Sequence, residues 1–211
     1  MFYRITTYFS LLCCSIVLIG CATLFSAQEW SENYALLEGA RATSPQMIDG
    51  KLETVGEAIF ASEDTRRLVR GGSEVVVTLP EKKRIHKILL HADNLKHIII
   101  YADKGGGILD GSDWQYVKEM QSIKTNPIEL KVLIPYPTDR IRVRVLKTTE
   151  DAQLAREKNR RFGAITFVST TGAPGKIREI EIYGYKTAEE MEVDKTVDNR
   201  EKELDDLLDF E

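Results

Sequence analysis

Three residues of one short loop have the chemistry to hold a divalent cation. Asp49, Lys51 and Thr54 stand at offsets of zero, two and five, and Gly50 permits a sharp turn between them. Ca²⁺ takes about six to eight oxygen ligands, which a tight loop supplies from carboxylates, hydroxyls and backbone carbonyls. The loop is therefore a candidate calcium site. The alternative is an Asp-Gly turn that Asp49 caps without any metal.

A second polar group follows the middle one of the three histidines. His91 is close in sequence to Asp93 and Asn94, and sugars are bound by a few convergent polar groups beside an aromatic ring. These three residues are therefore candidates for a ligand-binding loop. His86, His91 and His97 lack the spacing of a zinc-ligand pair with a third donor, so we expect the histidines on strand surfaces.

All three cysteines, Cys13, Cys14 and Cys21, lie in the first 21 residues. Their absence from the rest of the chain excludes a disulfide framework, a cysteine zinc site and a cysteine nucleophile from the folded part. The chain also has no Gly-x-Ser-x-Gly, no His-Glu-x-x-His and no phosphate-binding glycine loop before a helix. We therefore expect a protein that is not an enzyme.

The N-terminus is predicted to be an export signal, because Leu11–Ile19 is an apolar stretch of nine residues followed by a small residue and a cysteine. Leu18–Cys21 resembles a bacterial lipobox, in which the cysteine receives a diacylglycerol and becomes the new N-terminus. Acyl chains on Cys21 would anchor the protein to a membrane. Ala22 is not the aspartate that retains lipoproteins in the inner membrane, which favours the outer membrane. The alternative is an uncleaved signal anchor over Ser10–Phe25.

The elements that must position the candidate residues have the pattern of β-strands. A chain of 211 residues with a net charge of −4 and 43% apolar residues fits one domain with tails, and its charge does not suggest a nucleic-acid partner. Ile141–Val145 alternates apolar residues with arginines, which predicts a strand with one buried and one cationic face. About eight short strands favour an antiparallel sandwich or barrel. The other predicted strands are Glu74–Leu79, which would stop at Pro80, then Ile85–Ala92, Lys96–Ala102, Trp114–Val117, Ile128–Ile134, Ala164–Val168 and Ile177–Tyr183.

Two of these strands lead to expectations about single side chains. Trp114 lies within a strand, so we expect it to pack in the core. In the last strand, period-two alternation turns Ile180 and Ile182 to one side and Glu179 and Glu181 to the other.

The C-terminal residues 186–211 differ from the rest in charge, with four basic and eleven acidic residues and a net charge of −7. Val193, Val197, Leu204 and Leu208 would share one stripe of a helix. The segment is therefore either a solvated acidic tail with transient helix, or a docking peptide that folds onto a basic or apolar partner surface.

Taken in order, segments from about Asn33 to Tyr185 resemble a discoidin domain (coagulation factor 5/8 type C, galactose-binding-like). The resemblance implies an eight-stranded jelly-roll β-sandwich whose loops at one end bind ligands. Two features depart from it. The family usually has an aromatic residue just after the Asp-Gly loop, where this chain has Val55–Phe60 with Phe60 as its one aromatic residue. The segment Thr148–Gly175 is also longer than usual. The segments that carry the resemblance are Asn33–Leu36, Gly39–Ser44, Met47–Gly50 with Thr54, Val75–Leu79, Ile85–Leu90, Ser112–Val117, Arg140–Val145 and Ile177–Gly184.

The resemblance also completes the predicted calcium site, because sugar-binding relatives often hold calcium in the Asp-Gly loop. It implies side-chain ligands from an aspartate, a threonine and a glutamate of the last strand, and backbone carbonyls from three further residues. In this chain the implied ligands are Gln46, Asp49, Lys51, Thr54, Arg178 and Glu179.

We therefore expect four segments: a lipoprotein signal peptide (1–20), a tether (21–33), a discoidin-like domain (34–185) and an acidic, partly helical or disordered tail (186–211). The expected function is that of a membrane-anchored, non-catalytic lipoprotein of the cell envelope, which recognises a glycan or envelope surface through the loop end. The alternative is an assembly or scaffold lipoprotein that binds a protein partner through the sandwich face or the acidic tail. A nucleic-acid partner is not expected.

Overall fold

The structure is a computed structural model that describes residues 28–60, 72–107, 111–154 and 172–187, together with 190–192, 194, 196, 197, 200 and 202. The export signal, Cys21 and the strand predicted at Ala164–Val168 lie outside these residues. Trp30–Tyr185 forms one compact unit. The residues on either side of it form a second unit, which is described by itself below.

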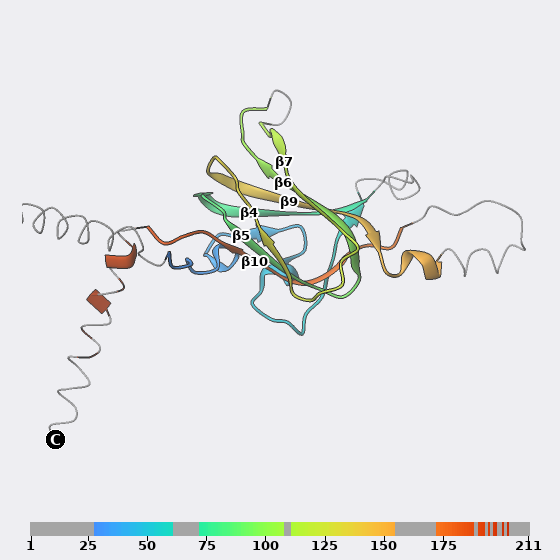
Figure 1. The fold of residues 1–211 in the computed structure, drawn as a ribbon, viewed down its shortest axis with the longest axis horizontal. Helices are drawn as coiled ribbons and strands as arrows, with labels where there is room; N and C mark the ends of the chain where they lie inside the picture. Colours follow the sequence, from blue (N-terminus) through green and yellow to red (C-terminus); the bar gives the residue numbers. More distant parts are fainter. Residues whose placement is uncertain are drawn as a thin grey trace, which may run out of the picture. The chain divides into compact units, whose positions relative to one another are not determined.

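The larger of two sheets has six strands in the order β1-β4-β9-β6-β7, with β3 also paired to β4 (Figure 1). All of its pairings are antiparallel. The strands are β1 (Arg41–Ala42), β3 (Ile59–Phe60), β4 (Ser73–Lys83), β6 (Leu95–Asp103), β7 (Trp114–Gln121) and β9 (Thr138–Thr148).

The smaller sheet has the order β2-β10-β5-β8 and is likewise antiparallel. Its strands are β2 (Gly56–Glu57), β5 (Lys87–Ala92), β8 (Ile128–Lys131) and β10 (Lys176–Tyr183), and two short 3₁₀ helices, η2 (Tyr34–Leu36) and η3 (Pro45–Ile48), precede β2. The two antiparallel sheets confirm the all-β sandwich predicted from the sequence.

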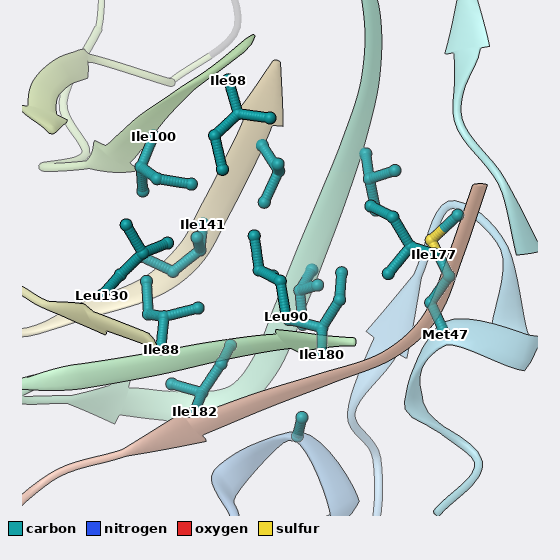
Figure 2. Close-up of a cluster of buried hydrophobic side chains, with 14 of the residues drawn as sticks. Met47, Ile88, Leu90, Ile98, Ile100, Leu130, Ile141, Ile177, Ile180 and Ile182 are labelled. Carbon is teal, nitrogen blue, oxygen red and sulfur yellow. The ribbon is translucent and has the colours of Figure 1, made fainter. Parts of the chain in front are cut away.

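The core lies between the inner faces of the two sheets, as Figure 2 shows for its isoleucines and leucines. In β9, Ile141, Val143 and Val145 are buried while the arginines between them stay partly exposed, which confirms the predicted alternation. Burying one such side chain contributes about 1.5–3 kcal/mol. The largest fully buried side chains are Met47, Ile85, Ile88, Leu90, Ile98, Ile100, Ile128, Leu130, Ile141, Ile177, Ile180 and Ile182.

Several strand bounds differ from the sequence prediction, and two differences concern single residues. β4 continues past Pro80 to Lys83, although its pairing with β9 is interrupted between Thr78 and Lys83, where proline has no N–H to offer the ladder. Trp114 does not pack in the core: it lies on the outer face of the larger sheet, where the guanidinium carbon of Arg142 is 4.0 Å from its ring centroid. An aromatic residue in a strand can face either side, so strand position alone did not place it.

The loops of the sandwich gather at two ends. At the end that we call the loop end, the β5–β6 turn at Asp93 and Asn94 binds the start of β10 through the Asp93 amide and the Lys176 carbonyl at 3.1 Å. The Thr149 amide after β9 donates to the Asn94 carbonyl at 2.8 Å. At the opposite end Trp30 and Tyr185 pair as an isolated antiparallel bridge, and their rings stack at 4.7 Å.

In the second unit, the Lys186 ammonium group meets Glu29 at 3.1 Å and Asp194 at 2.7 Å. Of the residues after 187 that the structure describes, all are helical. No helix among the described residues has the length and apolar character needed to cross a membrane.

Candidate functional site

The predicted calcium loop begins where η3 ends and turns at Gly50, whose φ of 72° favours glycine. The Thr54 hydroxyl lies among four acceptor oxygens: both carboxylate oxygens of Asp49 at 3.0 and 2.9 Å, the Lys51 carbonyl at 3.0 Å and the Gln46 carbonyl at 3.3 Å. A hydroxyl has one proton and can donate to one acceptor at a time. The loop therefore gathers more acceptor oxygens than its own donors can satisfy.

Glu179 of β10 lies against this loop and is 3% exposed. One of its carboxylate oxygens, Oε2, accepts a hydrogen bond from the Gly50 amide at 3.1 Å. The other, Oε1, is buried and has no hydrogen-bond partner among the described residues. Burial, and after it the negative charges of Asp49 and Glu181, raises the pKa of Glu179 to about 7.

Surplus acceptor oxygens and a buried carboxylate oxygen without a partner fit a bound calcium ion. Of the six predicted ligands, Gln46, Asp49, Lys51 and Thr54 converge within one loop, and Glu179 is attached to that loop through Gly50. Only two of these six are carboxylates. Within the described part of the chain no group of three or more His, Cys, Asp and Glu side chains could hold a metal ion, so the site depends on carbonyls and a hydroxyl.

The sixth predicted ligand, Arg178, is predicted to offer its carbonyl, and its side chain forms a fork with Asp93. Its Nε and Nη2 donate to the two Asp93 oxygens at 2.6 and 3.0 Å, and its Nη1 donates to the Leu52 carbonyl at 2.9 Å. The Asp93 carboxylate raises the pKa of Arg178 above its usual range. The fork thus ties the β5–β6 turn to the Asp-Gly loop and holds a charged pair, one third exposed, at the loop end.

The other two predicted ligand-binding residues point elsewhere. Asn94 is buried, and its amide group is used by the backbone: the nitrogen donates to the Pro174 carbonyl at 3.0 Å and the oxygen accepts from the Lys176 amide at 2.8 Å. His91 meets Glu181 at 2.7 Å on the outer face of the smaller sheet. The structure therefore brings Asp93 to the exposed rim but does not gather His91, Asp93 and Asn94 around one point.

The three histidines have acidic or aromatic partners that their sequence spacing did not indicate. The Glu181 carboxylate also accepts a hydrogen bond from the Tyr183 hydroxyl, and burial together with this carboxylate raises the pKa of Tyr183 to about 12. His97 meets Glu119 at 2.7 Å across β6 and β7. The His86 ring lies 4.5 Å from the ring of Tyr185.

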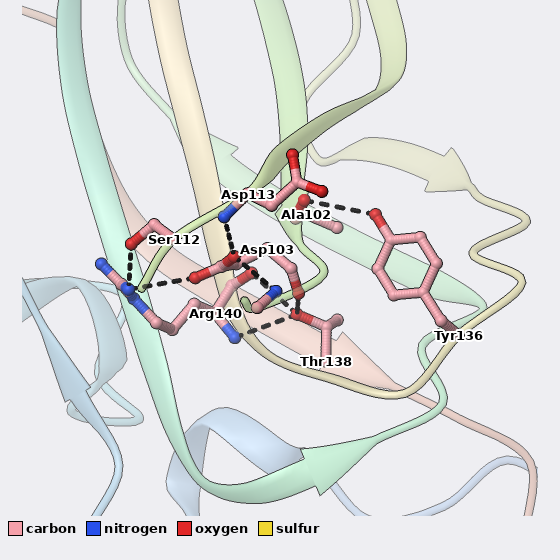
Figure 3. A network of polar contacts seen from close by, with 8 residues as sticks. Ala102, Asp103, Ser112, Asp113, Tyr136, Thr138 and Arg140 are labelled. Carbon is pink, nitrogen blue, oxygen red and sulfur yellow. Dashed lines mark hydrogen bonds and ion pairs between the residues drawn. The ribbon is translucent and has the colours of Figure 1, made fainter. Parts of the chain in front are cut away.

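A further polar network at the opposite end went unnoticed in the sequence (Figure 3). The buried Asp103 accepts hydrogen bonds from the amides of Gly105 and Asp113 at 2.8 and 2.7 Å and pairs with Arg140 at 3.0 Å. The Thr138 hydroxyl donates to the Asp103 carbonyl at 2.7 Å. Both carboxylate oxygens and the carbonyl of Asp103 thus accept hydrogen bonds within the protein, and these bonds organise the β6–β7 connection.

No family model and no curated relative matches the chain. Its structure neighbours are carbohydrate-binding modules of the galactose-binding-like, or discoidin-like, fold. Chitosan-binding module 1 of a chitosanase/glucanase from Paenibacillus sp. IK-5 has 14% sequence identity and a TM-score of 0.47, over 73% of this chain and 100% of that one. The family 32 module of Clostridium perfringens NanJ, solved with galactose, has 14% identity and a TM-score of 0.46, over 74% of this chain and 100% of that one.

A third neighbour contains two such domains. It is the pair of family 32 modules from Clostridium perfringens ZmpB, solved with GalNAc, with 15% identity and a TM-score of 0.47 over 75% of this chain and 37% of that one. These neighbours are binding modules, and some neighbours are separate domains within enzymes.

Proposed function

We propose that this chain is a non-catalytic, lipid-anchored protein that binds a glycan at the loop end of its sandwich. The observation that carries the proposal is the fork between Arg178 and Asp93, held in place by the Leu52 carbonyl and still one third exposed. A charged pair that the protein holds in one orientation and that is open to solvent is a preorganised site for a polar ligand.

The chemistry of the fork suits adjacent sugar hydroxyls. The guanidinium group of Arg178 offers only donors and the carboxylate of Asp93 only acceptors, while each sugar hydroxyl is both. Two neighbouring hydroxyls can therefore bind one to each side of the pair. Leu52 and Val55, both exposed, supply apolar surface beside it for the C–H face of a sugar ring.

Calcium would support this site by fixing the Asp-Gly loop. The ion would be held by the side chains of Asp49, Thr54 and Glu179 and by the carbonyls of the remaining predicted ligands. Its positive charge would offset the negative charge of the buried Glu179 carboxylate. The Leu52 carbonyl, which fixes the Arg178 fork, belongs to the same loop. Calcium would therefore act on glycan affinity through the loop geometry and not by contact with the sugar.

The anchor is proposed from the sequence alone, because the lipobox-like Leu18–Cys21 lies outside the described part of the chain. A diacylglycerol on Cys21, with Ala22 after it, would place the protein on the outer membrane of the cell envelope. The sandwich would then present its loop end to glycans of the envelope or of its surroundings.

Binding of the full chain to an array of glycans, in buffer that contains calcium, tests the proposal. Asp93→Asn keeps the size of the side chain but removes its charge, and Arg178→Gln removes the fork; each should reduce binding by about tenfold or more. Lys96→Gln removes an exposed charge two residues after Asn94 and serves as the matched control. If both fork variants bind as well as the Lys96→Gln control, the loop end is not the glycan site.

A further inference from the structure

The outer face of the larger sheet carries aromatic and arginine side chains in neighbouring rows. The pairing of β7, β6 and β9 places Tyr116 beside Tyr101 and Tyr101 beside Arg142. In the next row Trp114 is paired with Asp103, and Asp103 meets Arg140 at 3.0 Å. We refer to Tyr101, Trp114, Tyr116, Arg140 and Arg142 as the aromatic–arginine platform.

The side chains of the platform are packed against one another. The guanidinium carbons of Arg142 and Arg140 lie 4.0 and 5.0 Å from the centroid of the Trp114 ring. The rings of Tyr101 and Tyr116 meet edge to face at 6.4 Å and 84°. Cation–π and edge-to-face contacts of this kind hold rings in fixed orientations, so the platform is preorganised.

The two arginines differ in how their charge is neutralised. Arg140 is bound to the buried Asp103 and to the Ser112 hydroxyl (Figure 3). The Arg142 side chain donates no hydrogen bond within the described residues: its Nε is buried without an acceptor, and its ion pair with Glu74 is long, at 3.8 Å. A guanidinium that lies flat on an indole keeps the N–H groups at its edge for an incoming acceptor, and a carboxylate matches that edge with two oxygens.

A groove continues from the platform at Tyr116. It lies between β7 and the segment that follows β8, has a volume of about 340 Å³, and is lined by Lys104, Gln115, Tyr116, Leu133 and Tyr136 among others. Small-ligand pockets have volumes of about 300 to 1,000 Å³. Leu133 and Tyr116, at 84% and 60%, are the two most exposed large apolar side chains of the described residues.

We propose that the platform and this groove bind an acidic polysaccharide, with the carboxylate of one uronic acid residue on Arg142 and the neighbouring sugar in the groove between Tyr116 and Tyr136. Aromatic faces suit sugar rings, and hydroxyls of the groove sugar would meet Gln115 and the ammonium group of Lys104. This surface lies on the sheet face, away from the Arg178 fork, and does not depend on the function proposed for the loop end.

The low charge of the surface favours a uronic acid polymer over a nucleic acid. A nucleic acid presents a phosphate at every nucleotide, and its binding depends on neutralising several of them. On the platform Asp103 already neutralises Arg140. Arg142 and, in the groove, Lys104 are the cations that would meet the ligand, which is too few for a chain that is bound mainly through its phosphates.

Calorimetric titration of the full chain with a ten-residue oligogalacturonate tests this inference. The wild-type chain should bind it, and should bind a neutral galactan oligomer of the same length at least tenfold more weakly. Arg142→Gln should weaken oligogalacturonate binding by about tenfold or more, Arg142→Lys by less, and Tyr116→Ala by about fivefold or more. Lys147→Gln, which changes an exposed lysine of the same strand, should bind as the wild type does.

A spectroscopic measurement locates the ligand independently of these variants. The chain has two tryptophans, so in a Trp30→Phe chain the fluorescence comes from Trp114 and should change on titration with oligogalacturonate. Equal affinity for the neutral oligomer, unchanged affinity in both Arg142→Gln and Tyr116→Ala, or tighter binding of a ten-nucleotide single-stranded DNA would each overturn the inference. Loss of binding in Asp93→Asn with retention in the platform variants would assign the acidic sugar to the loop end instead.

Discussion

The Glu179 carboxylate accepts a hydrogen bond from the Gly50 amide, which lies 129 positions earlier in the chain, at 3.1 Å. This contact attaches the last strand of the smaller sheet to the Asp-Gly loop. It leaves the second oxygen of Glu179 buried without a partner, beside a loop whose oxygens outnumber their donors. A cation would resolve both features, which gives the first prediction.

Calcium should raise the melting temperature of the full chain. A ligand that binds only the folded state stabilises it by about 2.7 kcal/mol at 100 times its Kd, which for a chain of this size is about 5 to 10 °C. Asp49→Ala should abolish the response to calcium, whereas Glu129→Ala, an exposed carboxylate of β8, should keep it. Differential scanning calorimetry in calcium and in chelator is the measurement, and identical melting curves for the wild type would show that the loop is only a turn.

The strand pattern explains why the fold was predictable and single sites less so. Ile141, Val143 and Val145 alternate with arginines, and period two in β-strands turns such residues to opposite faces whatever their partners are. The same rule holds at Glu179, which pairs with His91 and so shares the outer face of the smaller sheet with Glu181. Its burial was not predictable from the strand, because the Asp-Gly loop covers it there and lies 129 positions earlier in the chain.

The site residues show the same division between local and distant information. Asp49, Lys51 and Thr54 were predictable because they lie within one loop, and their oxygens do converge. The partnership of Arg178 with Asp93 spans 85 positions and follows only from the pairing of β10 with β5.

The Asp103 network should contribute more to stability than any exposed ion pair. Asp103→Ala would remove the acceptor of two loop amides and leave Arg140 without its partner. Loss of one member of a buried ion pair costs about 3 to 5 kcal/mol, and we expect a loss of about 3 kcal/mol in the free energy of unfolding, measured by urea denaturation. Asp103→Asn keeps one acceptor oxygen and should lose less. Asp139→Asn, which changes a partly exposed carboxylate next to Arg140 in the sequence, is the matched control. A loss no larger than that control would contradict the role assigned to Asp103.

Cys21 should carry the lipid. In cells that export and process lipoproteins, the mature chain should begin at Cys21 with acyl chains, and Cys21→Ala should leave the protein without lipid and released from membranes by salt washing. Cys14→Ala, a cysteine within the export signal, should be processed as the wild type is. Intact-mass spectrometry of the detergent-extracted protein distinguishes these results, and an unmodified N-terminus at any other residue contradicts the lipoprotein assignment.

Removal of the acidic tail should leave the sandwich intact. Trp30–Tyr185 is a compact unit with its own core, and the Trp30–Tyr185 bridge that closes it stays in a chain that ends at Tyr185. The tail carries a charge of −7, so it gains little by folding alone. We therefore expect the truncated chain to melt within about 2 °C of the full chain. Ile182→Ala, which empties a fully buried position of β10, should by contrast lose about 2 to 5 kcal/mol and shows that the assay detects damage to this strand. A truncated chain that melts several degrees lower, with Ile182→Ala behaving as expected, would mean that the tail belongs to the folded unit and is not a separate docking segment.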